Sequence, residues 1–232
     1  MIKFHYSYII MAIGFILTGY YLNLIVFTSL ILIHELGHYT IAKILKFNVE
    51  KIIIYPYGGL TKINDLINKN INHELLISIS GIILQIIFFL IIKELNNINI
   101  IRTYTYNLYQ KYNYELIIFN LLPIYPLDGS KILSSLLNKI LPYNNSNITI
   151  IIVSLISIFI ILIKDIYSNN YSNIIIISIL MEYIYKFYKQ LKYIYNKFLL
   201  ERYMFKIKYK NKKYLKEEEF LNNLFDLNNK IW

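Results

Sequence analysis

Long apolar runs, interrupted by charged and turn-forming residues, dominate the pattern of this 232-residue chain. A helix needs about 20 mostly apolar residues to cross the hydrocarbon core of a bilayer. Runs that approach this length fall in six places, at 6–21, 23–43, 74–92, 114–140, 148–163 and 172–188. The pattern therefore predicts an all-α polytopic membrane protein with about six transmembrane helices.

The last part of the chain is much more polar than the rest. We expect a six-helix transmembrane domain over 1–188, with its core at 20–140, and a short basic C-terminal segment over 189–232. The stretch RYMFKIKYK, residues 202–210, alternates as a strand does. Some 40 residues are too few for a sizeable core, so this segment is expected to be an appendage.

Basic residues indicate the orientation in the membrane. With a cytosolic N-terminus, 20 of the 24 Lys and Arg fall on one side of the six spans and four on the other. Cytoplasmic loops carry an excess of Lys and Arg, so both termini are expected to be cytosolic. The net charge of +10 suits the anionic surface of the lipid bilayer, and we expect no nucleic-acid partner.

Composition limits the chemistry that the chain can support. It is 56% hydrophobic and contains no cysteine and four histidines. Disulfides and Cys-based metal sites are therefore excluded, and any bound metal must use His, Asp or Glu.

The run LILIHELGHYTIAKIL, residues 30–45, places two histidines and a glutamate inside an apolar span. His34 and His38 lie about 40° apart around a helix and roughly 6 Å apart along it, so one ion can bridge both rings. Glu35 lies beside that ion, where a carboxylate can act as a general base toward water. The alternative is a set of hydrogen-bonded helix polar groups, although each charge within a span costs a few kcal/mol.

Two histidines and a water leave tetrahedral zinc one ligand short, and a second stretch supplies a candidate. FNLLPIYPLDGSKIL, residues 119–133, carries two prolines three positions apart, and these predict a broken helix. Asp128 follows them and is the only aspartate within the expected spans. The alternative is a simple kink from which Asp128 reaches cytosolic water.

KIIIYPYGGLTKI, residues 51–63, has the β-branched composition of a strand followed by a Gly-Gly turn. It lies just after the metal-binding helix, although an ordinary surface loop would have the same composition. In SISGIILQ, residues 78–85, Gly81 permits close helix packing, and we assign no catalytic role to Gln85.

Together, H-E-x-x-H on one span and N-x-x-P-x-x-P-L-D-G on a later one resemble the site-2 protease family of intramembrane zinc metalloproteases. The short form without an inserted domain is most similar to the branch of stage IV sporulation protein FB. The resemblance covers residues 20–140 well, although Ile82 and Gln85 replace the proline and asparagine that the family often has.

The resemblance implies one Zn²⁺ ion and a role for each motif residue. The metal ligands would be His34, His38 and Asp128, with Glu35 as catalytic acid and base. The 51–63 segment would be a small membrane-dipping β-hairpin near the active site. The residues expected to contact substrate are Asn120, Pro123, Tyr57, Gly58 and Gly59.

The resemblance also implies a reaction and a location. The expected reaction is cleavage of a membrane-associated protein precursor by zinc-activated water, and the precursor would be a sporulation sigma factor cut near its pro-sequence. The expected location is the mother-cell membrane around the forespore, where other membrane proteins would regulate the enzyme.

Two other functions are consistent with the same residues. The first is a membrane metal or proton carrier, because ionisable groups inside a membrane often mark such routes. A carrier needs access from both faces, but the outer part of the 23–43 span offers only Asn23, Thr28 and Ser29. The second is a pseudoprotease scaffold, although all the catalytic positions are present.

Overall fold

Helices dominate the computed structural model, which describes residues 2–64, 67–168 and 174–205. The helices are α1 (Tyr6–Leu17), α2 (Tyr21–Ile44), α3 (Ile71–Asn97), α4 (Thr103–Leu121), α5 (Asp128–Ile140), α6 (Tyr143–Tyr167) and α7 (Ile174–Phe205). The strands are β1 (Ile2–Phe4), β2 (Val49–Tyr55) and β3 (Gly58–Ile63).

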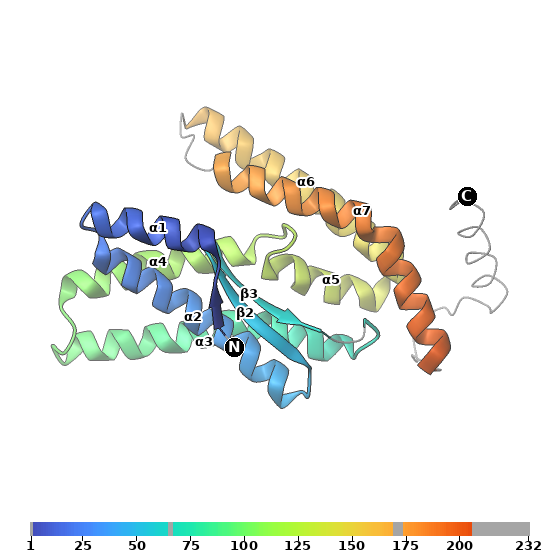
Figure 1. Cartoon of the computed structure of the whole chain (residues 1–232), viewed down its shortest axis with the longest axis horizontal. Helices are drawn as coiled ribbons and strands as arrows, with labels where there is room; N and C mark the ends of the chain where they lie inside the picture. The colour runs from blue at the N-terminus through green and yellow to red at the C-terminus, as the bar shows by residue number, and fades with distance from the viewer. Residues whose placement is uncertain (1, 65–66, 169–173, 206–232) are drawn as a thin grey trace.

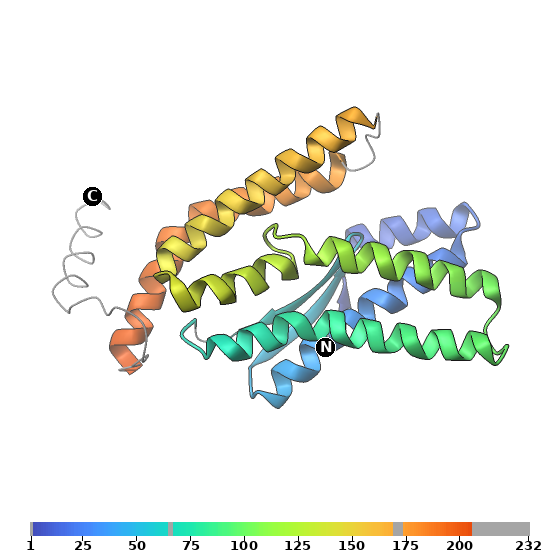
Figure 2. The same ribbon diagram turned by 180° about the vertical axis from the view of Figure 1, so that it is seen from behind.

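The helices form two groups joined by α5. Helices α1 to α4 gather on one side with the small sheet next to α2, whereas α6 and α7 run side by side as a pair (Figure 1). The view from behind shows α5 between α3 and α6, both of which it contacts (Figure 2). The site residues on α2 and α5 therefore meet where the two groups approach each other.

Each group has its own apolar core. Leu30 and Ile31 of α2 pack with Ile54 of β2 in the first core, and these side chains are at most 2% exposed. Ile124, which lies between α4 and α5, packs with residues of α6 and α7 in the second. The sheet is thus part of the first core, and the α4–α5 connection is part of the second.

Three of the described helices are long and apolar enough to span a membrane, namely α2, α3 and α6. Helix α1 is apolar but has only 12 residues. Helix α7 begins within the expected 172–188 span and carries three charged residues in its apolar half, Glu182, Lys186 and Lys189. A membrane protein is thus supported, whereas the expected number of six complete spans is not confirmed.

The expected span at 114–140 is wrong as a single helix. Helix α4 already begins at Thr103 and ends at Leu121, and α5 starts at Asp128. The irregular backbone between them packs on α6, where the Ser154 hydroxyl accepts a hydrogen bond from the Tyr125 amide at 3.0 Å. Proline lacks an amide hydrogen, which explains the break. The contact with α6 gives the Tyr125 amide, which is outside any helix, a hydrogen-bond acceptor.

The expected hairpin at 51–63 is present as strands β2 and β3, which pair antiparallel. Gly58 and Gly59 are the first residues of β3 and pair with Tyr55 and Ile54, so they do not form the turn itself. Strand β1, which the sequence pattern did not predict, pairs in parallel with the other edge of β2. The sheet order is β1-β2-β3, which leaves β3 as an edge strand in the described part of the chain.

Helix α7 continues through the boundary expected at residue 188 and extends to Phe205. The strand expected at 202–210 is therefore wrong for residues 202–205, and its remainder lies outside the described residues. Glu201 is 5% exposed, and its carboxylate accepts hydrogen bonds from the backbone amides of Ile67 and Asn68 at 2.8 and 3.1 Å. These contacts hold the end of α7 against the connection between β3 and α3.

Candidate metal centre and substrate cavity

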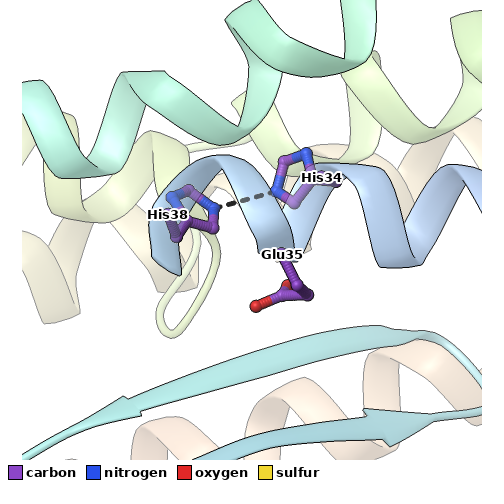
Figure 3. Close-up of side chains that lie close together, drawn as sticks. All are labelled: His34, Glu35 and His38. Carbon is purple, nitrogen blue, oxygen red and sulfur yellow. Dashed lines mark hydrogen bonds between the residues drawn. The ribbon is translucent and has the colours of Figure 1, made fainter. Parts of the chain in front are cut away.

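One turn of α2 presents all three residues of the H-E-x-x-H motif. His34, Glu35 and His38 are each 4% exposed. Both imidazoles leave α2 on the same side, whereas the Glu35 side chain leaves it toward the strands (Figure 3). This divergence follows from the helical repeat, since residues four apart share a face and adjacent residues differ by about 100°.

Asp128 joins the two histidines from α5. Its Oδ2 atom lies 2.8 Å from Nε2 of His34 and 2.9 Å from Nε2 of His38. The two Nε2 atoms are themselves 3.0 Å apart. The structure therefore brings the three predicted metal ligands together around a single point, although Asp128 is 90 positions from His38 in the chain.

The hydrogen bonds of the outer ring nitrogens indicate which atoms face that point. Nδ1 of His38 is 2.7 Å from the carbonyl oxygen of Ile77. A carbonyl can only accept, so Nδ1 carries the hydrogen and the neutral ring presents the lone pair of Nε2. Two imidazoles and one carboxylate form a donor set of catalytic zinc sites, so these residues fit zinc.

Gln85 of α3 lies against the other histidine. Its Oε1 atom is 2.9 Å from Nδ1 of His34, and its side chain is fully buried. Sequence reasoning assigned no catalytic role to this residue. The available signal was a polar residue four positions after Gly81 in an apolar helix, but nothing in the sequence places it beside His34.

Glu35 faces β3, where two residues set its position. The Thr61 hydroxyl donates a 2.7 Å hydrogen bond to Oε2 of Glu35. A Cβ atom added at Gly59 would overlap the Glu35 side chain, so only glycine allows the strand to approach this closely. Glu35 and both histidines offer ligand atoms within 4.8 Å of one another. The Glu35 carboxylate therefore lies beside the candidate metal position.

Lys131 is a further residue that the sequence analysis did not select. Its Nζ atom lies 2.8 Å from Oδ1 of Asp128, the oxygen that faces away from the histidines. The spacing of three residues on a helix was the available signal. This ion pair occupies one carboxylate oxygen and leaves Oδ2 directed toward the histidines.

A cavity of about 560 Å³ opens onto these groups. Four of the five residues expected to contact substrate line it, namely Asn120, Tyr57, Gly58 and Gly59. Pro123 is not part of the lining, and its carbonyl accepts a 3.3 Å hydrogen bond from the Ser154 hydroxyl. The hairpin and the α4–α5 connection thus line the same cavity as the candidate metal ligands.

Aromatic residues connect α7 to the hairpin and to the α4–α5 connection across this cavity. The hydroxyls of Tyr57 and Tyr183 are 3.0 Å apart, and the rings of Tyr125 and Phe187 stack with centroids 4.2 Å apart. Burial, together with the hydrogen bond to Tyr183, raises the pKa of the Tyr57 hydroxyl. Tyr57 therefore stays neutral at physiological pH and can both donate and accept hydrogen bonds.

Comparison with known proteins gives consistent results. The sequence model of peptidase family M50 matches residues 22–95 and 92–164. The chain is 28% identical over 211 residues to stage IV sporulation protein FB of Bacillus subtilis, a match that covers 88% of this chain and 72% of that protein. It is 36% identical over 124 residues to zinc metalloprotease MJ0392 of Methanocaldococcus jannaschii, which covers 51% of this chain and 34% of that protein.

The fold is also similar to that of a solved structure. The site-2 protease from Methanocaldococcus jannaschii matches with a TM-score of 0.59 at 24% identity. The match covers 93% of this chain and 94% of that structure's chain.

Proposed function

The chain belongs to peptidase family M50, the site-2 protease family, and on that premise we propose that it is an intramembrane zinc metalloendopeptidase. Zn²⁺ would be held by His34, His38 and Asp128, and Glu35 would be the general base. The observation that carries this proposal is the convergence of two Nε2 atoms and one carboxylate oxygen within 3.0 Å of one another. Glu35 lies on the same cavity.

The residues divide the chemistry among them. When bound, zinc would supply a Lewis acid that lowers the pKa of a water and stabilises the negative charge on the scissile carbonyl oxygen. Glu35 takes a proton from the attacking water and returns it to the leaving amine. Thr61 holds the Glu35 carboxylate during both transfers, because it donates to Oε2.

Strand β3 provides a mode of substrate binding. A helical segment hides its peptide groups, so a substrate must become extended before it is cut. The described residues leave the outer edge of β3 unpaired. Five residues of β3 line the cavity, Gly58, Gly59, Leu60, Thr61 and Ile63. An extended segment can add to such an edge through backbone hydrogen bonds. Asn120 and Tyr57 lie on the same cavity and would bind the substrate by their polar groups.

Cellular roles follow from the same premise. The similarity to a sporulation protein supports a membrane-associated sigma-factor precursor as the substrate, in the mother-cell membrane around the forespore. Both termini would be cytosolic, with residues 1–188 as the protease domain and 189–232 as a basic cytosolic segment. Other membrane proteins would regulate cleavage.

The carrier alternative receives less support. The three polar residues in the outer part of α2 are all engaged by neighbouring helices. Asn23 donates to the Tyr112 hydroxyl at 2.8 Å, Ser29 is 3.1 Å from the Tyr109 hydroxyl, and Thr28 contacts the Tyr8 hydroxyl. A second entry route along this part of α2 would have to break these contacts.

The proposed function is tested by co-expression with a sporulation sigma-factor precursor. Wild-type protein is expected to shorten the precursor on a gel, whereas the Glu35→Gln variant is expected to leave it intact. Conversion by both proteins would contradict the assignment of Glu35 as the base. Conversion by neither, with zinc bound, would contradict the choice of substrate.

A further inference from the structure

A buried amide network connects α3 and α4 behind the metal ligands. Gln85 is 0% exposed and Asn113 is 7% exposed. Nε2 of Gln85 donates to two acceptors of Asn113, the side-chain oxygen at 3.1 Å and the backbone carbonyl oxygen at 3.3 Å. Its other end, Oε1, is 2.9 Å from Nδ1 of His34.

These contacts determine which way round the Gln85 amide lies. A backbone carbonyl can only accept, so the atom facing the Asn113 carbonyl must be the amide nitrogen. The oxygen of Gln85 is consequently the atom that faces His34. Oxygen can only accept, so Nδ1 of His34 carries a hydrogen, and the neutral form of the ring, which is the form that binds a metal, has its lone pair on Nε2.

The two histidines are therefore fixed by different means. The orientation of His38 depends on the backbone carbonyl of Ile77, which no side-chain substitution removes. The orientation of His34 depends on the Gln85 side chain, which a single substitution can remove. Of the two histidines, only His34 therefore has a ring orientation that a substitution in a neighbouring side chain can test.

We propose that Gln85 is a positioning residue that holds His34 with Nε2 free to bind the metal, and that Asn113 in turn holds Gln85. This inference rests on the zinc-binding function proposed above. A hydrogen bond to the outer ring nitrogen fixes the tautomer and orientation of a metal-binding histidine, and losing such a partner commonly weakens metal affinity 10–100-fold. A buried amide in an apolar helix is otherwise costly, which explains why every polar atom of Gln85 is paired.

The test measures zinc affinity by competition with a chromophoric chelator, using the purified full-length chain in detergent. Gln85→Met keeps the size of the side chain and removes its acceptor, so we expect zinc binding to weaken about 10–100-fold. Gln85→Glu retains an oxygen that can accept from His34 but loses the amide hydrogens that bond to Asn113, so it is expected to recover part of that affinity. Unchanged affinity in Gln85→Met, or equal loss in both variants, would overturn the proposal.

A matched control separates positioning from a general loss of helix contacts. Tyr112→Phe removes a different hydrogen bond between α2 and α4, the one from Asn23, and is expected to leave zinc affinity unchanged. Should Gln85→Met fail to fold, Asn113→Leu removes one of the two acceptors of Gln85. Weaker zinc binding in that variant would support the proposal, and unchanged binding would overturn it.

Precursor cleavage in the same preparations distinguishes this inference from the proposed function. A wild-type protein that cleaves, alongside a Gln85→Met protein with normal zinc affinity, would overturn the role of Gln85 and leave the protease intact. A wild-type protein that binds zinc without cleaving the precursor, alongside a Gln85→Met protein with weakened zinc binding, would support the role of Gln85 and contradict the proposed substrate.

Discussion

Thr61 donates a hydrogen bond of 2.7 Å to the carboxylate of Glu35, and this contact links the candidate base on α2 to strand β3. Strand β3 is also the edge on which we propose that the substrate lies. The group that takes a proton and the strand that would hold the scissile peptide are therefore positioned by the same element. Their spacing does not depend on the packing of distant helices.

Replacing Thr61 tests this link. Thr61→Val keeps the β-branched shape that a strand favours but removes the hydroxyl, and hydrogen bonds to charged groups contribute about 1.5–3 kcal/mol. We expect kcat for precursor cleavage to fall at least about tenfold with zinc content unchanged. Thr61→Ser keeps a hydroxyl and should retain most of the activity. Equal activity of the Val and Ser variants would contradict a role for this hydrogen bond.

Gly81 of α3 faces the two candidate metal ligands on α2 directly. A Cβ atom added there would overlap Nε2 of His38 and crowd His34, so Gly81→Ala is expected to displace both rings and abolish stoichiometric zinc binding. Gly14→Ala in α1 is the matched control, because no atom beyond the local helix backbone lies within 4 Å of the added Cβ. Zinc content measured by elemental analysis should fall only in Gly81→Ala. Full zinc content in that variant would show that the ligands lie elsewhere.

Ser154 holds the irregular backbone between α4 and α5. Ser154→Ala leaves the partly buried Tyr125 amide without its acceptor, which costs about 1–3 kcal/mol. The variant should unfold at a lower temperature in detergent. Ser157→Ala, which removes only a hydrogen bond to the carbonyl of Val153 within α6, should differ little from wild type. Similar melting temperatures for all three proteins would contradict the proposed role of Ser154.

The parts of the site that the sequence predicted are those that local geometry determines. His34, Glu35 and His38 lie on one helical turn, so their relative directions follow from the helical repeat alone. Asp128 was found by a different argument, because the apolar spans contain no other aspartate. Proline chemistry predicted the break before Asp128, but hydropathy alone still joined α4 and α5 into one span.

The parts that were missed depend on packing between segments far apart in the chain. Gln85 is 51 positions from His34, and Thr61 is 26 from Glu35. Nothing in the periodicity of α3 indicates which of its polar residues faces α2. Strand β1 has only three residues and forms because β2 offers it an edge, so its own sequence carries little strand signal.

The most direct test of the account measures zinc content and precursor cleavage on the same purified samples of wild type and Glu35→Gln. The three ligands are intact in the variant, and general acid–base catalysis commonly contributes 10²–10⁴-fold to rate. We predict one zinc per chain in both proteins, with cleavage at least about 100-fold slower in the variant. A variant that cleaves at the wild-type rate, or a wild-type protein without zinc, would contradict the account.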